Sequence, residues 1–454
     1  MTAEERIQVF ESMPVHRAVY RQILPAVISQ MIALIYNLAD TYFVGLLNAP
    51  AQTTAVTVAY PSFLMLTAIS NLFGIGGASA FSRALGKHDR DAGGEIYTAS
   101  FWMALLSGAV YVILFACFRG SILRVSGATD ETWLPVVGYT RWVILIGGIP
   151  VVLNGFLANM LRAEGNAARA SFGVSLGGIL NLILDPLMIL PQFAGMGAAG
   201  AGLATAISNG VSVVYFLWIT SRNDTDSLLR LRPAFLLQIR KHFREIVSIG
   251  FPSALQYALT VVAVAAQAKF VSQYPTQAVA ALGITKKLDQ LPLYFSIGVS
   301  SGLMPFLAFN HASGNASRRR EAFRFGVAIS LGFALFTLVL YESFAPFFAS
   351  LFIRDEVTIG YAASFLRRMV VAMPLMSVCY PMIIQFQAMG RAGESLVCSV
   401  LRKGVLDIPL LFLMDALFPL YGLMWVQPIV DAVSLAVCVL LYYRLSNGKT
   451  VKNN

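Results

Sequence analysis

Charged residues are scarce in this chain. Lys, Arg, Asp and Glu make up 12% of its 454 residues, whereas a soluble domain carries about 25%. Hydrophobic residues account for 57% of the sequence, and the mean hydropathy is +0.69. This composition excludes an ordinary soluble domain and predicts an all-α integral membrane protein that crosses the bilayer many times.

The motifs of common enzymes and of nucleotide-driven pumps are also missing. No HExxH or GxSxG motif occurs, and the four histidines fall in segments expected to be helix ends or loops. The run Gly74-Ile75-Gly76-Gly77 has no Lys-Ser/Thr partner and no strand before it, so it is not a phosphate loop. We therefore predict that the protein is not an enzyme, has no cofactor and does not use ATP.

Paired cysteines and a cleavable leader are absent as well. The four cysteines lie far apart in apolar stretches without a CxxC motif, so we interpret them as packing residues. The first 21 residues contain no apolar core with a small-residue cleavage site, and we expect no signal peptide. The net charge of +10 would suggest nucleic acid for a soluble protein. The distribution of the basic residues over the loops explains this net charge better, and we predict no nucleic-acid partner.

What the sequence has in abundance is long apolar stretches. Charged or Gly/Pro/Asn clusters divide it into twelve stretches of about the 20 residues that a bilayer requires. The predicted spans are 19–45, 54–81, 95–118, 133–158, 167–190, 196–220, 245–272, 277–309, 322–345, 360–388, 395–418 and 422–443.

Basic residues gather on alternate loops. The set that includes both termini and the 221–244 loop holds 22 of the 33 Lys and Arg, and the opposite set holds three. The other eight lie inside spans or at their ends. This bias predicts that both termini and the 221–244 loop are cytoplasmic, which agrees with an even number of spans.

The chain repeats itself at an offset near 222–227. Leu24-Pro25-Ala26 corresponds to Phe251-Pro252-Ser253, while Thr205 and Asn209 correspond to Gln427 and Asp431. Six spans duplicated in parallel predict two six-helix bundles related by a pseudo-two-fold axis along the membrane normal. We predict an N-terminal lobe at 1–220, a linker at 221–244 and a C-terminal lobe at 245–454, with the substrate site between the lobes.

A carboxylate lies inside the fifth span. Asn181 and Asp185 are four residues apart, so they share one face of a helix. Pro186 follows and frees the carbonyl of Leu182 from the helical ladder. A carboxylate in hydrocarbon costs about 2.5 kcal/mol or more, so such residues are functional by default.

Two further spans supply polar residues in the same half. Asp40 lies in the first span with Tyr36 one turn before it, and Thr205 and Asn209 lie one turn apart in the sixth. Two carboxylates in a low dielectric do not both ionise easily, so such a pair can hold a proton near neutral pH. The same oxygens could instead coordinate Na⁺. Alternatively, each polar residue only caps or cross-links neighbouring helices.

The repeat is unequal at these positions. Asp40 corresponds to Gln267 and Asp185 to Leu410, so the N-terminal half holds the acidic site. Four other charged residues in the C-terminal spans fit ion pairs along a helix. These predicted pairs are Lys286 with Asp289 and Lys403 with Asp407.

Several of these segments together resemble one family, the multidrug and toxic compound extrusion (MATE) transporters, and within it the bacterial MepA-like drug exporters. The resemblance extends from about residue 17 to 444. It rests on NLADTYFVG, GIGGASAFSRALG, LRAEGNAARASFGVSLGGILNLILDPLMI, MGAAGAGLATAISN, QFQAMGRAGESLVCSVLRKG and WVQPIVD.

The resemblance implies twelve helices in two lobes and alternating access in a bacterial cytoplasmic membrane. It also implies export of small cationic amphipathic compounds in exchange for H⁺ or Na⁺. Its cation site, a possible Na⁺ site, falls on Asp40, Asn181, Asp185 and Thr205, with Tyr36 beside Asp40. Another branch uses acids in helices 7 and 10; this chain has Gln256 and Gln267 in the seventh span and no acid within 360–388, so that site is not carried over. For the substrate cavity we name Asn154, Asn209, Gln256, Lys269 and Asp431.

Other functions remain open at this point. A flippase for a lipid-linked precursor, from the same superfamily, would line its cavity with cations, for which Lys269, Lys286 and Lys287 are available. A membrane-embedded enzyme would need a nucleophile–base pair or a metal cluster, and the sequence offers neither. The duplication argues against a receptor or channel, because alternating access uses two lobes and a channel does not need them. Because both lobes lie in one chain, we expect a monomer.

Overall fold

The computed structural model describes residues 3–222, 229, 231 and 239–447, and in these residues it is helical without strands. The first half contains α1 (Ala3–Glu11), α2 (Val15–Gly45), α3 (Pro50–Gly86), α4 (Arg90–Val125), α5 (Trp133–Thr140), a π-helical turn (Arg141–Ile146), α6 (Gly148–Ala163), α7 (Ala167–Ile189) and α8 (Ala198–Arg222). The second contains α9 (Ile239–Val271), α10 (Thr276–Ala312), α11 (Ala316–Ser350), α12 (Glu356–Met369), α13 (Ala372–Ala388), α14 (Ala392–Val400), a π-helical turn (Leu401–Val405), α15 (Asp407–Leu417) and α16 (Gly422–Asn447).

Nine of the helices in the described residues are long and apolar enough to cross a membrane. Two bent pairs also qualify, α5 and its π-helical turn with α6, and α12 with α13, with bends of 49° and 45°. Counting each pair as one span gives eleven. The remaining predicted span, 395–418, is interrupted. Of the predicted linker, residues 223–228, 230 and 232–238 lie outside the described residues.

Side-chain caps fix where several of these helices begin. Asp89 accepts the backbone N–H of Ala92 at the start of α4, and Asp355 accepts that of Thr358 at the start of α12. These contacts satisfy N–H groups that have no partner inside the helix. The 37 residues of α10 extend about 55 Å, so this helix projects beyond a hydrocarbon core about 30 Å thick.

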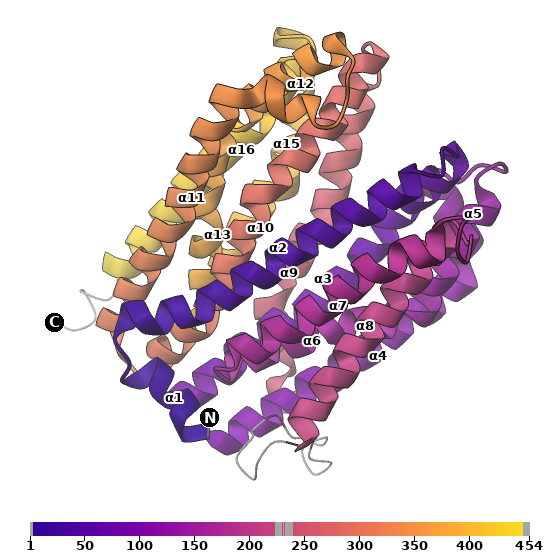
Figure 1. The fold of residues 1–454 in the computed structure, drawn as a ribbon. Helices are drawn as coiled ribbons and strands as arrows, with labels where there is room; N and C mark the ends of the chain where they lie inside the picture. The colour runs from indigo at the N-terminus through magenta and orange to yellow at the C-terminus, as the bar shows by residue number, and fades with distance from the viewer. Residues whose placement is uncertain (1–2, 223–228, 230, 232–238, 448–454) are drawn as a thin grey trace.

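The helices form two arms, one from the first half of the chain and one from the second (Figure 1). The arms meet at the end that carries both chain termini and diverge toward the opposite end. Helix α3 packs against α9, and α2 packs against α10. These four helices are the first two spans of each half, so the joint follows the predicted repeat.

Glycines allow the helices of the joint to approach closely. A Cβ atom placed on Gly76 or Gly250 would overlap backbone atoms of the facing helix across the α3–α9 contact. Gly298 and Gly302 have the same role where α10 crosses α2. Small residues at such crossings let helix backbones pack directly against each other. The joint is therefore built the same way on both sides.

Helix α1 lies across the joint at the end with the termini. Its Arg6 forms an ion pair of 3.0 Å with Glu164 of the first half, and both side chains are buried. Its Phe10 packs against Phe306 and Phe309 of the second half. One short helix thus contacts both arms.

Ion pairs close the other side of the joint. Arg83 of α3 lies 2.7 Å from Glu245 of α9. Glu95 of α4 lies 2.8 Å from both Lys241 and His242 of α9. The end that carries the termini is therefore held shut by charge as well as by packing.

The eleventh predicted span departs from a continuous helix. Lys403 is extended (φ −140°, ψ 107°) and Gly404 has φ +129°, a conformation that residues with side chains rarely adopt. Helix α15 begins three residues later, where Asp407 accepts the Gly404 N–H at 2.8 Å. The predicted pair between Lys403 and Asp407 does not form, because the Lys403 ammonium donates to Gln427 instead.

Candidate functional site

The polar residues of α7 and α8 form one buried network in the first half. The Asn181 amide donates to Asp185 at 3.2 Å and to the Thr205 hydroxyl at 3.5 Å. Helix α7 continues through Pro186 to Ile189, so Asn181 and Asp185 keep their helical spacing. The i, i+4 arrangement expected from the sequence is present.

The network extends to a third helix. Asn209 donates to the carbonyl of Thr205 at 2.9 Å and accepts from Asn154 of α6 at 2.7 Å. Asn154 and Asn209, which we named for the substrate cavity, therefore lie next to the predicted cation site. Their role in substrate binding stays a prediction.

Helix α2 brings Tyr36 and Asp40 to the same place. The Tyr36 ring lies against Gly178 of α7, where an added Cβ atom would come within 3.0 Å of it. Gly178 is one turn before Asn181 on the same helix face. The carboxylates of Asp40 and Asp185 are close enough to interact electrostatically. The structure thus brings together all five residues of the predicted coupling site.

Three oxygens of this cluster have no hydrogen-bond donor within the described residues. They are Oδ1 of Asp40, Oδ1 of Asn181 and Oδ2 of Asp185, and all three are buried. A buried acceptor without a donor is unfavourable. Carboxylate and amide oxygens are the ligands that hard cations prefer. The site is therefore suited to a proton or to a hard cation such as Na⁺.

Tyr139 belongs to this cluster and was missed in the sequence. It is buried on α5, within electrostatic range of Asp40, Asp185 and Tyr36. Its backbone carbonyl lies against Gly202 of α8. Nothing in its spacing distinguishes it from other aromatic residues in apolar spans, because its position depends on how α5 packs.

The other three predicted cavity residues lie in the second half. Gln256 is buried and donates to the Tyr380 hydroxyl at 3.3 Å. Lys269 is exposed near the end of α9. Asp431 is fully buried and lies 3.1 Å from Arg402. Gln256 and Asp431 are joined through Tyr380 and Arg402.

Arg402 is the centre of the polar cluster in the second half. Its guanidinium lies between Asp431 and the ring of Tyr380, 4.1 Å from the ring centroid. Sequence spacing did not suggest this pair, because Arg402 and Asp431 lie on different helices. The predicted pair of Lys286 with Asp289 does not form within 4.0 Å in the described part of the chain.

An all-helical membrane protein with two bundles and a buried acidic site has the architecture of a secondary transporter. The sequence model of the MatE family matches residues 25–187 and 252–413, which together are more than half of the chain. The chain belongs to the MatE family. The two matched segments correspond to the two copies of the repeat.

Related proteins align over nearly the full length. The chain is 27% identical over 450 residues to the multidrug export protein MepA of Staphylococcus aureus (strain MRSA252), covering 99% of this chain and 98% of that protein. It is 28% identical over 451 residues, with the same coverage, to the multidrug export protein MepA of Staphylococcus haemolyticus (strain JCSC1435).

Solved structures share the fold. One is the outward-facing conformation of a multidrug resistance MATE family transporter, with a TM-score of 0.90, 24% identity and coverage of 97% and 98% of the two chains. Another is a MATE transporter in complex with MaL6, with a TM-score of 0.91, 24% identity and coverage of 98% and 99%. The predicted all-α MATE fold is confirmed.

Proposed function

We propose that this protein is a secondary active multidrug exporter, which moves cationic amphipathic compounds out of the cytoplasm in exchange for H⁺ or Na⁺. Its similarity to multidrug export proteins over 99% of the chain supports export of drugs. The single observation that carries the coupling is the buried acidic cluster, where oxygens of Asp40, Asn181 and Asp185 lack donors.

We further propose that the protein is a monomer in a bacterial cytoplasmic membrane with both termini in the cytoplasm. The excess of Lys and Arg on the loops of that side supports this orientation. The arms would then be closed toward the cytoplasm and divergent toward the outside (Figure 1). An alternating-access transporter releases its cargo from such a state.

The proposed coupling acts through α2. This helix carries Asp40, contacts α7 in its own half and α10 in the other, and contains Pro25. Cation binding at Asp40 and Asp185 would neutralise the cluster and favour a different bend or packing of α2. Proline is a common point of helix bending. A ligand shifts an equilibrium only by its differential affinity for the two states, so the cation and the drug would favour opposite states.

The test is efflux of ethidium from vesicles under an imposed pH gradient or an imposed Na⁺ gradient. We expect one gradient to drive efflux and Asp40→Asn to abolish it at wild-type expression. Asp130→Asn is the matched control, because the Asp130 side chain is 93% exposed. Efflux driven by the pH gradient alone assigns H⁺, and a requirement for Na⁺ assigns Na⁺.

Two results would contradict the proposal. Full transport by Asp40→Asn would remove the acidic cluster from the coupling mechanism. Failure of both gradients to move the dye would remove drug export, and the flippase for a lipid-linked precursor would then be the function to test.

A further inference from the structure

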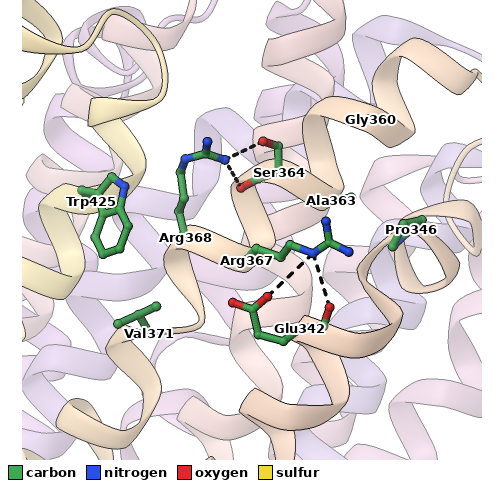
Figure 2. Close-up of a pocket in the computed structure, with 9 residues that line it drawn as sticks. All are labelled: Glu342, Pro346, Gly360, Ala363, Ser364, Arg367, Arg368, Val371 and Trp425. Carbon is green, nitrogen blue, oxygen red and sulfur yellow. Dashed lines mark hydrogen bonds and ion pairs between the residues drawn. The ribbon is translucent and has the colours of Figure 1, made fainter.

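Two adjacent arginines, Arg367 and Arg368, lie inside the predicted span 360–388 and have no part in the proposed transport mechanism. Both line a groove of about 730 Å³ between α11, α12 and α16 (Figure 2). Charged residues within membrane-spanning segments are rare and usually functional. The groove therefore requires an explanation of its own.

The depth of the groove follows from α11. Residues 325–341 of this helix carry no charge and span about 26 Å, close to the thickness of the hydrocarbon core. Glu342 is the first charge after this stretch. It therefore lies near the membrane surface opposite the end with the termini. Arg367 Nε lies 3.7 Å from the Glu342 carboxylate, so the arginines lie at the same level.

A proline creates part of this contact. Pro346 has no N–H, which leaves the carbonyl four residues earlier, that of Glu342, without its helical donor. Arg367 Nε donates to this carbonyl at 3.3 Å. Phe344 between them has non-helical angles (φ −123°, ψ 25°). The kinked end of α11 is therefore joined to α12 at the groove.

The groove faces away from the core of the arm. Ser364, Arg367, Arg368 and Val371 share one face of the α12 region, whereas Phe365 and its buried neighbours take the other. Large apolar side chains are exposed beside it. They are Phe344 (55%), Phe347 (59%) and Trp425 (39%). Such a surface at this level contacts lipid, and Trp is enriched at membrane interfaces.

The guanidinium groups keep hydrogen-bond donors available. Arg368 Nη1 donates to the carbonyl and the hydroxyl of Ser364, and its guanidinium stacks 4.6 Å from the Tyr421 ring centroid. Among the described residues, Arg368 Nη2 and both terminal nitrogens of Arg367 have no hydrogen-bond partner. Glu342 is the only carboxylate among the residues that line the groove, so the groove carries a net positive charge.

We propose that this groove binds the phosphate of a membrane phospholipid through Arg367 and Arg368, with a preference for anionic head groups. Arginine recognises phosphate through paired N–H donors, and basic pockets between membrane helices bind lipid head groups. The acyl chains would lie along the exposed apolar residues. A cationic drug does not suit a positive groove. Assigning the lipid to the outer leaflet rests on the proposed orientation, but the binding itself does not.

Native mass spectrometry of the purified full-length protein tests this proposal. We expect the wild type to retain phosphatidylglycerol in preference to phosphatidylcholine. Arg367→Gln/Arg368→Gln should lower the retained phosphatidylglycerol by about tenfold, and the exposed Arg354→Gln should leave it unchanged. Arg367→Lys/Arg368→Lys keeps the charge without the planar fork and should bind at an intermediate level.

Soluble glycerophosphoglycerol distinguishes a lipid from a free phosphate compound. We expect it not to displace phosphatidylglycerol from the wild type. Displacement at equal concentration would overturn the lipid assignment, and equal retention by the Gln and wild-type proteins would overturn the site. If thermal analysis shows that the Gln protein is unfolded, the test uses the Lys variant instead: retention of phosphatidylglycerol equal to that of the wild type would then overturn the site. Since no transport is measured, failure of the drug-export proposal does not affect the result.

Discussion

The two halves of the protein carry polar clusters at equivalent places in the repeat, but they neutralise their acids differently. In the second half, Arg402 lies against Asp431 and the Lys403 ammonium donates to Gln427. In the first half, no basic side chain in the described residues lies within 4.0 Å of Asp40 or Asp185. At these equivalent places a basic side chain lies beside the acid of the second half, whereas the acids of the first half lack a basic neighbour in the described residues and are available to a cation from solution.

This difference supports a single coupling site in a duplicated structure, as proposed above. Gln427 and Asp431 correspond in the repeat to Thr205 and Asn209 of the first half. A buried ion pair between two protein groups is hard to open, because each separated charge would remain desolvated. A carboxylate pair without a fixed counter-ion changes its net charge when it binds a proton or Na⁺. We therefore expect the first half to respond to the ion gradient and the second half to provide a constant structure.

The largest expected effect is the loss of transport when the acid of the first half is removed. Asp185→Asn should reduce ethidium efflux to the level of empty vesicles, because one of the two carboxylates proposed to bind the cation is lost. Its thermal stability should equal or exceed that of the wild type, since an unpaired buried carboxylate is removed. Efflux at half the wild-type rate or more would show that Asp185 is not essential.

The second prediction concerns the Arg402–Asp431 pair of the second half, whose loss should lower stability. Asp431→Asn should lower the free energy of unfolding by about 3–5 kcal/mol, because it leaves Arg402 buried without a counter-charge. Replacing both partners, Arg402→Met with Asp431→Leu, should restore much of this stability. Thermal unfolding of the three proteins is the measurement. A stable Asp431→Asn protein without transport would instead make Asp431 a functional residue.

A third prediction compares Gly178 of the first half with Gly404, which lies in the interrupted span of the second half. Gly404→Ala should lower the free energy of unfolding by about 1–2 kcal/mol, because φ is positive and the added Cβ atom would come within 2.8 Å of Leu259. Gly178→Ala should push Tyr36 away from α7 and lower efflux by about tenfold, since small displacements in a site have large effects on rate. Efflux and thermal unfolding of both variants check this. Equal losses of efflux in the two would contradict the comparison.

The halves also show what the sequence could predict. The apolar spans and the duplication can be recognised along the sequence itself. The pair Asn181–Asp185 depends on spacing along one helix, and the structure contains it as expected. The break at Lys403 and Gly404 was not predicted, because the apolar residues around it give the hydropathy of a continuous span. Arg402 with Asp431 was also missed. Such contacts join different helices, and their formation depends on packing rather than on local periodicity.

Two further features, helix α1 and Tyr139, were also missed because their roles depend on packing between helices. Helix α1 is a short charged segment in the sequence, and only its contacts with both arms give it a structural role. Tyr139 is one aromatic residue among many until α5 is placed against α3 and α8. Sequence reasoning therefore grouped the polar residues of α2, α7 and α8 in the first half, and it missed Tyr139 of α5.

The smallest expected effect concerns the joint between the halves. Arg83 binds Glu245 across the α3–α9 contact, whereas Asn310 of α10 makes uncharged hydrogen bonds, one of them to the carbonyl of Phe10. Arg83→Gln should weaken the closed joint by about 1 kcal/mol or less, because Glu245 is partly exposed and solvent screens the pair. Spin-label distances between the arms at the end with the termini are the measurement. They should show a larger open fraction in Arg83→Gln, and added salt should reduce the difference from the wild type. Asn310→Ala should respond to salt as the wild type does, so an equal salt effect in Arg83→Gln and the wild type would mean that this ion pair does not hold the joint.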